Sequence, residues 1–107
     1  MERILNINKT KEGFRLRLAG RFGFQQGRYV LDQDASLDLK EITKTLISLN
    51  RPILIESHTT TKESDDDWEL SLRRSMEVLR LMTQSYRFPK QLASVSAYAD
   101  NLSLIHI

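Results

Sequence analysis

The sequence predicts an α+β fold in which two helices pack on one mixed β-sheet. Residues 14–18 alternate apolar and charged side chains, which is the period of a half-buried strand. Residues 52–56 form a mostly apolar run, which indicates a central strand covered on both faces. Amphipathic helical patterns occupy residues 34–49 and 68–86, on either side of that run. The order of strands, helix, strand, helix and strands favours a two-layer α+β sandwich.

The composition indicates one compact domain over residues 1–107. A chain of 107 residues with 40% hydrophobic content can bury one core and is too short for two ordinary domains. Its 16 basic and 14 acidic residues leave a net charge of only +2, so no nucleic-acid partner is expected. The absence of cysteine excludes disulfides and thiolate chemistry. No run is as long as a membrane span, so membrane attachment is expected only through a segment not present here.

The first strands are expected at residues 3–8 and 14–18. The intervening Lys-Glu-Gly at residues 11–13 suits a tight turn, so the two segments form either an antiparallel hairpin or one broken edge strand. The alternation places the side chains of Arg15 and Arg17 outward.

The first helix follows a glycine-rich surface loop at residues 20–34. Asp34 or Ser36 is the expected N-cap, and Asn50 with Pro52 ends the helix. Its core-facing residues recur at helical spacing: Leu39, Ile42, Leu46 and Leu49. The glycines do not have the spacing of a phosphate-binding loop, so no nucleotide cofactor is expected.

The second helix begins after three consecutive aspartates, residues 65–67. Asp66 and Glu69 form a capping-box-like pair, which explains the acids without a metal ion, and the spacing of a calcium loop is absent. Ser71 and Ser75 lie within the apolar side of the helix, where small residues allow another element to approach closely. The helical run is expected to end at Phe88 and a proline.

Arg74 also falls on the apolar side of this helix, one turn from both Leu70 and Val78. A guanidinium withdrawn from water needs an anion or several acceptors. One interpretation is an internal carboxylate, or a side chain that reaches past the edge of the core to solvent. The other is a ligand carboxylate held in a bidentate pair. The residue pattern leaves both open.

The chain should end with strands at residues 93–98 and 102–107, joined by a turn at Asp100 and Asn101. His106, in the last strand, is interpreted as exposed or hydrogen-bonded rather than as a metal ligand. An enzyme is not expected. His58 and Ser71 could be neighbours in space, but no third group is spaced to orient the histidine as a base.

Two linked motifs resemble the OmpA-like domain family and, within it, the C-terminal domain of the flagellar motor protein MotB. The family pattern N-W-E-L-S-x-x-R-A-x-x-V appears as Asp-Trp-Glu-Leu-Ser at residues 67–71, followed by Arg74, Ser75 and Val78. The E-G-H-T-D signature appears at residues 56–60 as Glu-Ser-His-Thr-Thr. Residues 24–31 and 97–100 resemble the family's F-x-x-G-x-x-x-L and G-Y-G-E segments, so the likeness covers most of the chain.

The resemblance implies a non-catalytic domain that grips the diaminopimelate unit of peptidoglycan. In such domains a loop aspartate takes the ammonium group and a helix arginine takes a carboxylate; Arg74 matches the arginine, whereas Thr60 replaces the aspartate. The other ligand-binding residues implied by the motifs are His58, Thr59, Asp67, Leu70 and Ser71. The turn at residues 100–101 leaves no room for the helix that the family usually adds there, so a trimmed or divergent domain is expected.

Two functions follow as expectations from this resemblance. The first is a periplasmic cell-wall anchoring module of an envelope protein or of a flagellar motor stator-type protein. The second is a divergent domain that has lost wall binding with the aspartate and serves dimerisation or docking onto other envelope or motor proteins. Position 60 separates the two, because a threonine has no charge to pair with an ammonium group.

Overall fold

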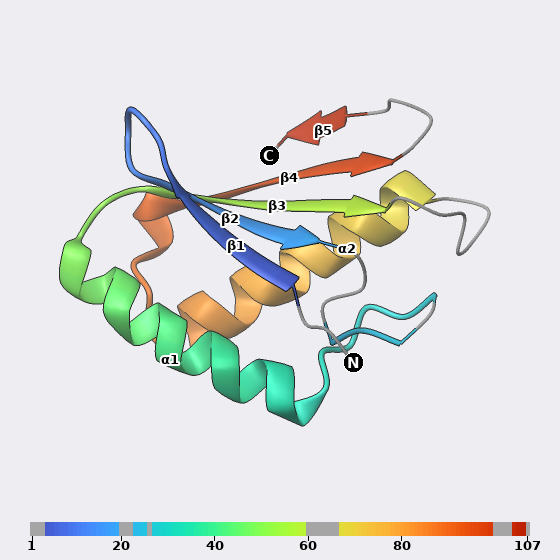
Figure 1. Cartoon of the computed structure of the whole chain (residues 1–107), viewed down its shortest axis with the longest axis horizontal. Helices are drawn as coiled ribbons and strands as arrows, with labels where there is room; N and C mark the ends of the chain where they lie inside the picture. The colour runs from blue at the N-terminus through green and yellow to red at the C-terminus, as the bar shows by residue number, and fades with distance from the viewer. Residues whose placement is uncertain (1–3, 20–22, 26, 60–66, 100–103, 107) are drawn as a thin grey trace.

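The computed structural model describes residues 4–19, 23–25, 27–59, 67–99 and 104–106 (Figure 1). At residues 4, 5, 19, 58, 59, 67, 68, 97–99 and 104–106 the backbone alone is described. The expected strand residues 3, 102, 103 and 107, the capping residue Asp66 and the turn at residues 100–101 lie outside these ranges.

The described strands form one mixed five-stranded sheet in the order β1-β2-β3-β4-β5. The outer pairs β1–β2 and β4–β5 are antiparallel, whereas β2–β3 and β3–β4 are parallel. Of the two alternatives for the first strands, the antiparallel hairpin is the one observed, and the predicted central position of the third strand is confirmed. The strands span Ile4–Lys9, Phe14–Ala19, Ile53–Thr59, Ala93–Ala99 and Leu104–His106.

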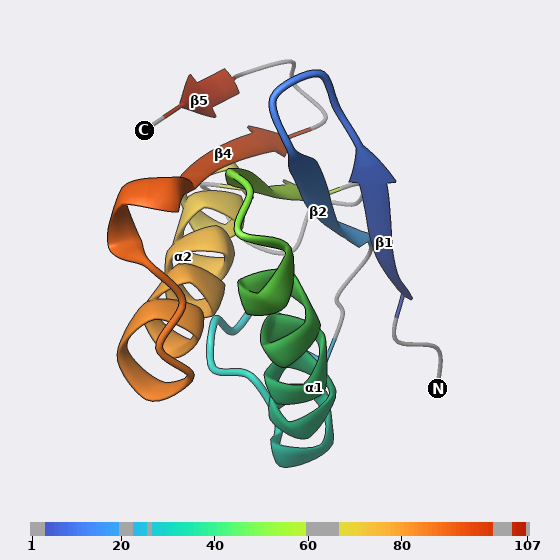
Figure 2. The same cartoon turned by 90° about the vertical axis from the view of Figure 1, so that its left-hand side faces the viewer.

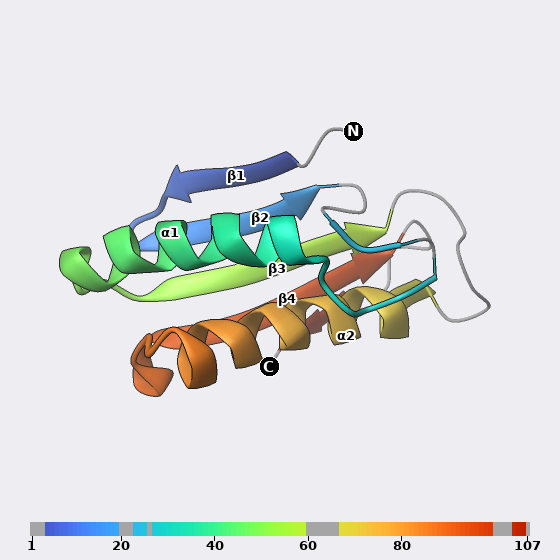
Figure 3. The same cartoon turned by 90° about the horizontal axis from the view of Figure 1, so that it is seen from below.

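Both long helices lie on the same face of the sheet (Figures 2 and 3). Helix α1 spans Gln33–Leu49 and joins β2 to β3, and helix α2 spans Asp67–Arg80 and joins β3 to β4. The predicted two-layer α+β architecture is therefore confirmed. Between the layers, the core collects side chains from the sheet, from both helices and from the segment after α2: Leu16, Leu18, Ile53, Ile55, Val95, Leu39, Leu46, Val78, Met82 and Phe88.

The opposite face of the sheet carries polar side chains. Glu56 lies between Arg15 and Arg17, with oxygen-to-Nε distances of 3.9 and 3.8 Å. Leu54 is only half-buried on this face, so the expectation that β3 is covered on both faces is wrong for the described elements. The arginines of β2 and the apolar residues between them confirm the alternation read from the sequence.

The N-cap of helix α1 lies two residues before Asp34 and four before Ser36, the two predicted caps. Asp32 is the N-cap, and its Oδ1 accepts a hydrogen bond from the Ala35 amide at 2.8 Å. The reason is that an antiparallel bridge between Phe24 and Leu31 ends immediately before Asp32, which leaves that residue extended and ready to start the helix. Asn50 ends α1 in the left-handed conformation, as predicted. Leu49 is exposed rather than core-facing.

The second helix ends in a widened turn. After Arg80 the chain continues as a π-helix over Leu81–Ser85, in which the Tyr86 amide donates to the Leu81 carbonyl at 2.9 Å. Arg87 then adopts a left-handed backbone with φ of 65°, and the Phe88 amide donates to the Met82 carbonyl at 2.8 Å. The wide turn reverses the chain and returns Phe88 to the core. A 3₁₀ turn over Lys90–Leu92 leads into β4.

Candidate functional site

Arg74 is the largest fully buried side chain among the described residues, with 1% of its surface exposed. Its Nε donates to the Arg28 carbonyl at 2.9 Å, and one terminal nitrogen donates to the Gln25 carbonyl at 3.3 Å. The guanidinium carbon lies 5.1 Å from the centre of the Phe24 ring, within the range of a cation–π contact. The inward direction predicted for this arginine is confirmed, and backbone carbonyls supply acceptors for it.

The loop that provides these acceptors is held in shape by its own backbone. The Arg28 amide donates to the Gln25 carbonyl at 2.9 Å, and the Asp32 amide donates to the Gly23 carbonyl at 2.9 Å. Gly23 has a φ of +77°, and a Cβ there would lie 2.4 Å from the Cβ of Ala35. Glycine is therefore required at position 23, both for its backbone conformation and for the approach of the loop to α1.

Small residues on α2 let the helix approach β4 closely. Ser71 and Ser75 have no exposed surface, and the Ser75 hydroxyl donates to the Ser96 carbonyl at 3.0 Å. The close approach predicted for these positions is confirmed. Leu70 is 5% exposed, so its side chain belongs to the packed side of α2 rather than to an open surface. The use of Leu70 and Ser71 in ligand binding stays a prediction.

The remaining predicted site residues lie around the carboxyl end of β3. His58 and Thr59 are the last two residues of that strand, and Asp67 is the first residue of α2. The topology thus brings these residues to the end of the sheet from which α2 departs, and Asp67 lies in the same helix as Arg74. Thr60 lies outside the described residues, so its predicted part in ligand binding is not tested.

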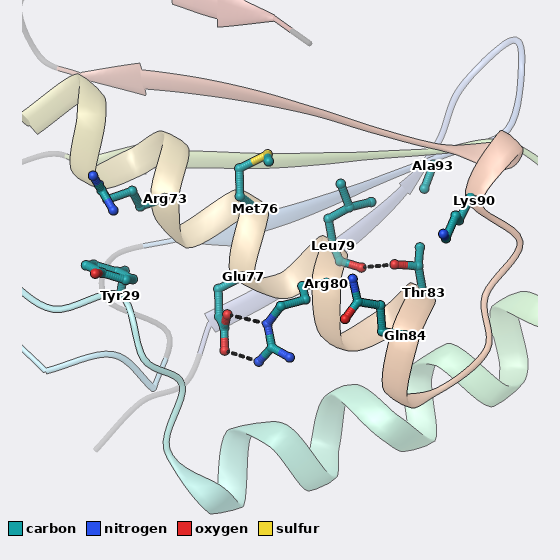
Figure 4. Close-up of a pocket in the computed structure, with 10 residues that line it drawn as sticks. All are labelled: Tyr29, Arg73, Met76, Glu77, Leu79, Arg80, Thr83, Gln84, Lys90 and Ala93. Atoms are coloured by element: carbon teal, nitrogen blue, oxygen red, sulfur yellow. Dashed lines mark hydrogen bonds and ion pairs between the residues drawn. The ribbon is translucent and has the colours of Figure 1, made fainter.

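A groove follows the outer side of α2 (Figure 4). We call it the α2 groove; it has a volume of about 550 Å³. Apolar surface comes from Met76, Leu79 and Ala93, and the rim is largely polar or charged. The rim residues are Tyr29, Arg73, Glu77, Arg80, Thr83, Gln84 and Lys90. The helical period alone does not predict this groove, because Tyr29, Lys90 and Ala93 come from the loop before α1, the turn before β4 and β4 itself.

Two ion pairs stiffen the exposed side of α2. Arg80 makes a two-pronged contact with Glu77, at 2.9 Å from Nε and 2.8 Å from Nη2. This hydrogen bonding, together with the charge of Glu77, raises the pKa of Arg80. Arg73 contacts Glu69 at 3.3 Å and lies 5.1 Å from the centre of the Tyr29 ring. Both pairs join residues three or four positions apart, the spacing at which side chains meet on a helix surface.

The sequence profile of the OmpA family matches residues 23–105, from the loop that binds Arg74 through the last described strand. The chain belongs to the OmpA family. Domains of the OmpA family are generally non-catalytic modules of the bacterial envelope that bind peptidoglycan. A comparison with curated protein sequences finds no match.

Two features are absent from the described part of this OmpA-family chain. No described helix is long and apolar enough to cross a membrane. Among the same residues, no three histidine, cysteine or acidic side chains gather in a way that could hold a metal ion.

Sequence reasoning found Arg74 but missed the backbone atoms that surround it. The carbonyls of Gln25 and Arg28 have no signature in side-chain chemistry. The available signal was indirect: Gly23 and Gly27, both with positive φ, mark a loop that folds back on itself. A fold-back loop directly before a helix could have been considered as a source of acceptors for the inward arginine.

Proposed function

We propose that this chain is a non-catalytic peptidoglycan-binding module in which Arg74 receives a carboxylate of the diaminopimelate unit. The observation that carries the proposal is the position of Arg74 on α2, the helix that leaves the carboxyl end of β3, where the motif residues His58 and Thr59 stand. Membership of the OmpA family supports the ligand class. The loop carbonyls and the Phe24 ring support the role of Arg74 by fixing the direction of its guanidinium.

Ligand binding at Arg74 requires a local rearrangement. A guanidinium has five N–H donors in a planar fork, which suits a carboxylate with two oxygens. Because only 1% of Arg74 is exposed, an incoming carboxylate must displace part of its surroundings. The contact to Gln25, at 3.3 Å, is longer than the 2.9 Å contact to Arg28 and is the one we expect to yield.

The residue at position 60 sets the expected strength. Thr60 offers a hydroxyl and no charge, so the ammonium group of diaminopimelate lacks an ion-pair partner at the position where the family motif has aspartate. We therefore propose weak binding by the native chain. In this proposal His58, Thr59 and Asp67 border the ligand, while Leu70 and Ser71 form the packed support beneath it.

The MotB-like motif supports a finer proposal about the parent protein. We propose a domain of an envelope or flagellar stator-type protein in the periplasm, connected to the membrane by a segment outside the present sequence. Homodimerisation is part of this proposal. The basis is the sequence resemblance of residues 67–78 and 56–60.

A second candidate function is protein docking without wall binding. It is favoured by one specific observation: the Arg74 guanidinium already holds the 25–28 loop, which is a structural role that needs no ligand. Together with the threonine at position 60, this arrangement suits a domain that keeps the fold and uses it to contact other envelope proteins or a second copy.

Co-sedimentation with purified peptidoglycan separates the two functions. The native chain should appear in the pellet at high protein concentration, and Arg74→Lys should reduce that fraction because an ammonium cannot form the two-pronged contact. Arg51→Lys is the matched control, since Arg51 is exposed at the opposite end of β3. A pelleted fraction that is absent, or that Arg74→Lys leaves unchanged in a folded protein, would favour docking.

A further inference from the structure

The α2 groove adjoins the loop that binds Arg74. Tyr29 follows Arg28, whose carbonyl accepts the Arg74 hydrogen bond, and Arg73 precedes Arg74 on α2. One end of the groove therefore lies beside the proposed carboxylate site. Figure 4 shows Tyr29 and Arg73 at that end, and Lys90 with Ala93 at the other.

The groove has the dimensions of a short extended peptide. Arg73 and Thr83 both line it and are ten residues apart, which corresponds to about 15 Å along a helix. An extended chain of about four residues covers a similar length. The volume of about 550 Å³ lies within the range of ordinary ligand sites.

The charges of the groove favour an anionic occupant. Three cations, Arg73, Arg80 and Lys90, line it with one anion, Glu77. Arg73 and Arg80 are paired with glutamates of their own helix, whereas the Lys90 ammonium has no ion pair within the described residues. Lys90 can thus meet a carboxylate without breaking an existing pair. Met76, 42% exposed, supplies apolar surface for the chain that carries it.

We propose that the α2 groove binds the peptide stem of peptidoglycan, with a free carboxylate of the stem on Lys90. The inference rests on the proposed function, because the diaminopimelate unit at Arg74 places the rest of the stem at the groove. The groove would lengthen the contact with the stem and would add a cation, Lys90, that recognises a carboxylate. These contacts would supplement a site that lacks the aspartate at position 60. We favour a carboxylate-bearing peptide over a glycan without peptide, because the Lys90 ammonium has no ion pair within the described residues and a carboxylate would supply one.

Chemical-shift titrations with two probes test the groove separately from Arg74. Free diaminopimelate reports on binding at Arg74 alone. A stem tetrapeptide that contains diaminopimelate reports on binding at Arg74 and in the α2 groove. The tetrapeptide should bind more tightly than the free amino acid. Lys90→Glu should lower the affinity for the tetrapeptide by about two- to fivefold, the effect of one exposed ion pair, and should leave the affinity for free diaminopimelate unchanged. Met76→Glu should also lower the affinity for the tetrapeptide and should leave the affinity for free diaminopimelate unchanged.

Matched controls lie on α1, away from the groove. Lys40→Glu and Leu37→Glu introduce the same side chain at exposed positions and should change neither titration. If the tetrapeptide binds and Lys90→Glu has no effect beyond Lys40→Glu, the groove inference is overturned while the proposed function stands. If neither probe binds, the proposed function fails and the inference fails with it. A peptide-free glycan oligomer that binds in a Lys90-dependent way would also overturn the assignment to a peptide.

Discussion

The Nε atom of Arg74 donates a hydrogen bond to the carbonyl of Arg28 at 2.9 Å, across 46 residues of sequence. This contact fastens α2 to the loop that precedes α1. It also fixes the guanidinium against the Phe24 ring. The arginine that we propose to hold a wall carboxylate is therefore also a structural link between two parts of the fold.

Replacing Arg74 by methionine should destabilise the domain. The change keeps much of the side-chain volume but leaves the Gln25 and Arg28 carbonyls without their guanidinium donor. The Gln25 carbonyl keeps the Arg28 amide as a donor, so only the Arg28 carbonyl loses the donor of a described contact, and the free energy of unfolding should fall by about 1–3 kcal/mol in urea titrations. Arg73→Met, one residue earlier and exposed, should stay within about 0.5 kcal/mol. Equal effects at both positions would show that the loop contacts contribute no stability.

The observed N-cap of α1 gives a test with a neighbouring control. Asp32→Ala removes the acceptor for the Ala35 amide and should lower the free energy of unfolding by about 0.5–2 kcal/mol. Gln33→Ala, at the exposed first residue of α1, leaves the Asp32 cap in place and should stay within about 0.5 kcal/mol of the native chain. Thermal or urea unfolding of both variants measures the two losses of stability. A loss for Gln33→Ala as large as that for Asp32→Ala would show that the Asp32 cap contributes no stability of its own.

Arg87 occupies a backbone conformation that favours glycine. Its φ of 65° lies in the left-handed region, which is strained for residues with a Cβ by roughly 1–2 kcal/mol. Arg87→Gly should therefore raise the free energy of unfolding by about 0.5–1 kcal/mol, after the greater flexibility of glycine in the unfolded chain is offset. Arg87→Ala is the control for loss of the side chain. A glycine variant no more stable than the alanine variant would mean that the turn after the π-helix stores no strain.

The periodic spacing of apolar residues predicted the two layers of the fold, because burial against a core imposes that spacing directly on the sequence. The alternation through Leu16 and the helical spacing through Leu39 and Val78 are consequences of packing against one core, so they are visible in the sequence. The cap of α1 was misplaced because the bridge between Phe24 and Leu31, which ends just before Asp32, is not a side-chain pattern. The end of α2 was predicted without its π-turn because no proline or glycine marks residues 81–85.

The candidate site was only partly predictable for a related reason. An arginine on an apolar helix face must find acceptors, and that requirement identified Arg74. The acceptors themselves are backbone atoms of residues 25 and 28, and their direction depends on the fold of the loop. The α2 groove depends on three separate segments meeting, so neither Tyr29 nor Lys90 could be assigned to it from local sequence.

The most direct test of the account is a calorimetric titration of a diaminopimelate-containing wall fragment into four proteins: the native chain, Thr60→Asp, Arg74→Ala and the double variant. Thr60→Asp restores an anion for the ammonium group, and one charge-assisted contact is worth about 1.5–3 kcal/mol. The account predicts weak binding by the native chain, affinity about ten- to a hundredfold higher for Thr60→Asp, and loss of that gain in the double variant. Circular dichroism of each protein confirms that it is folded. Tight binding by the native chain that folded Arg74→Ala leaves unchanged would contradict the account and place the wall contact elsewhere.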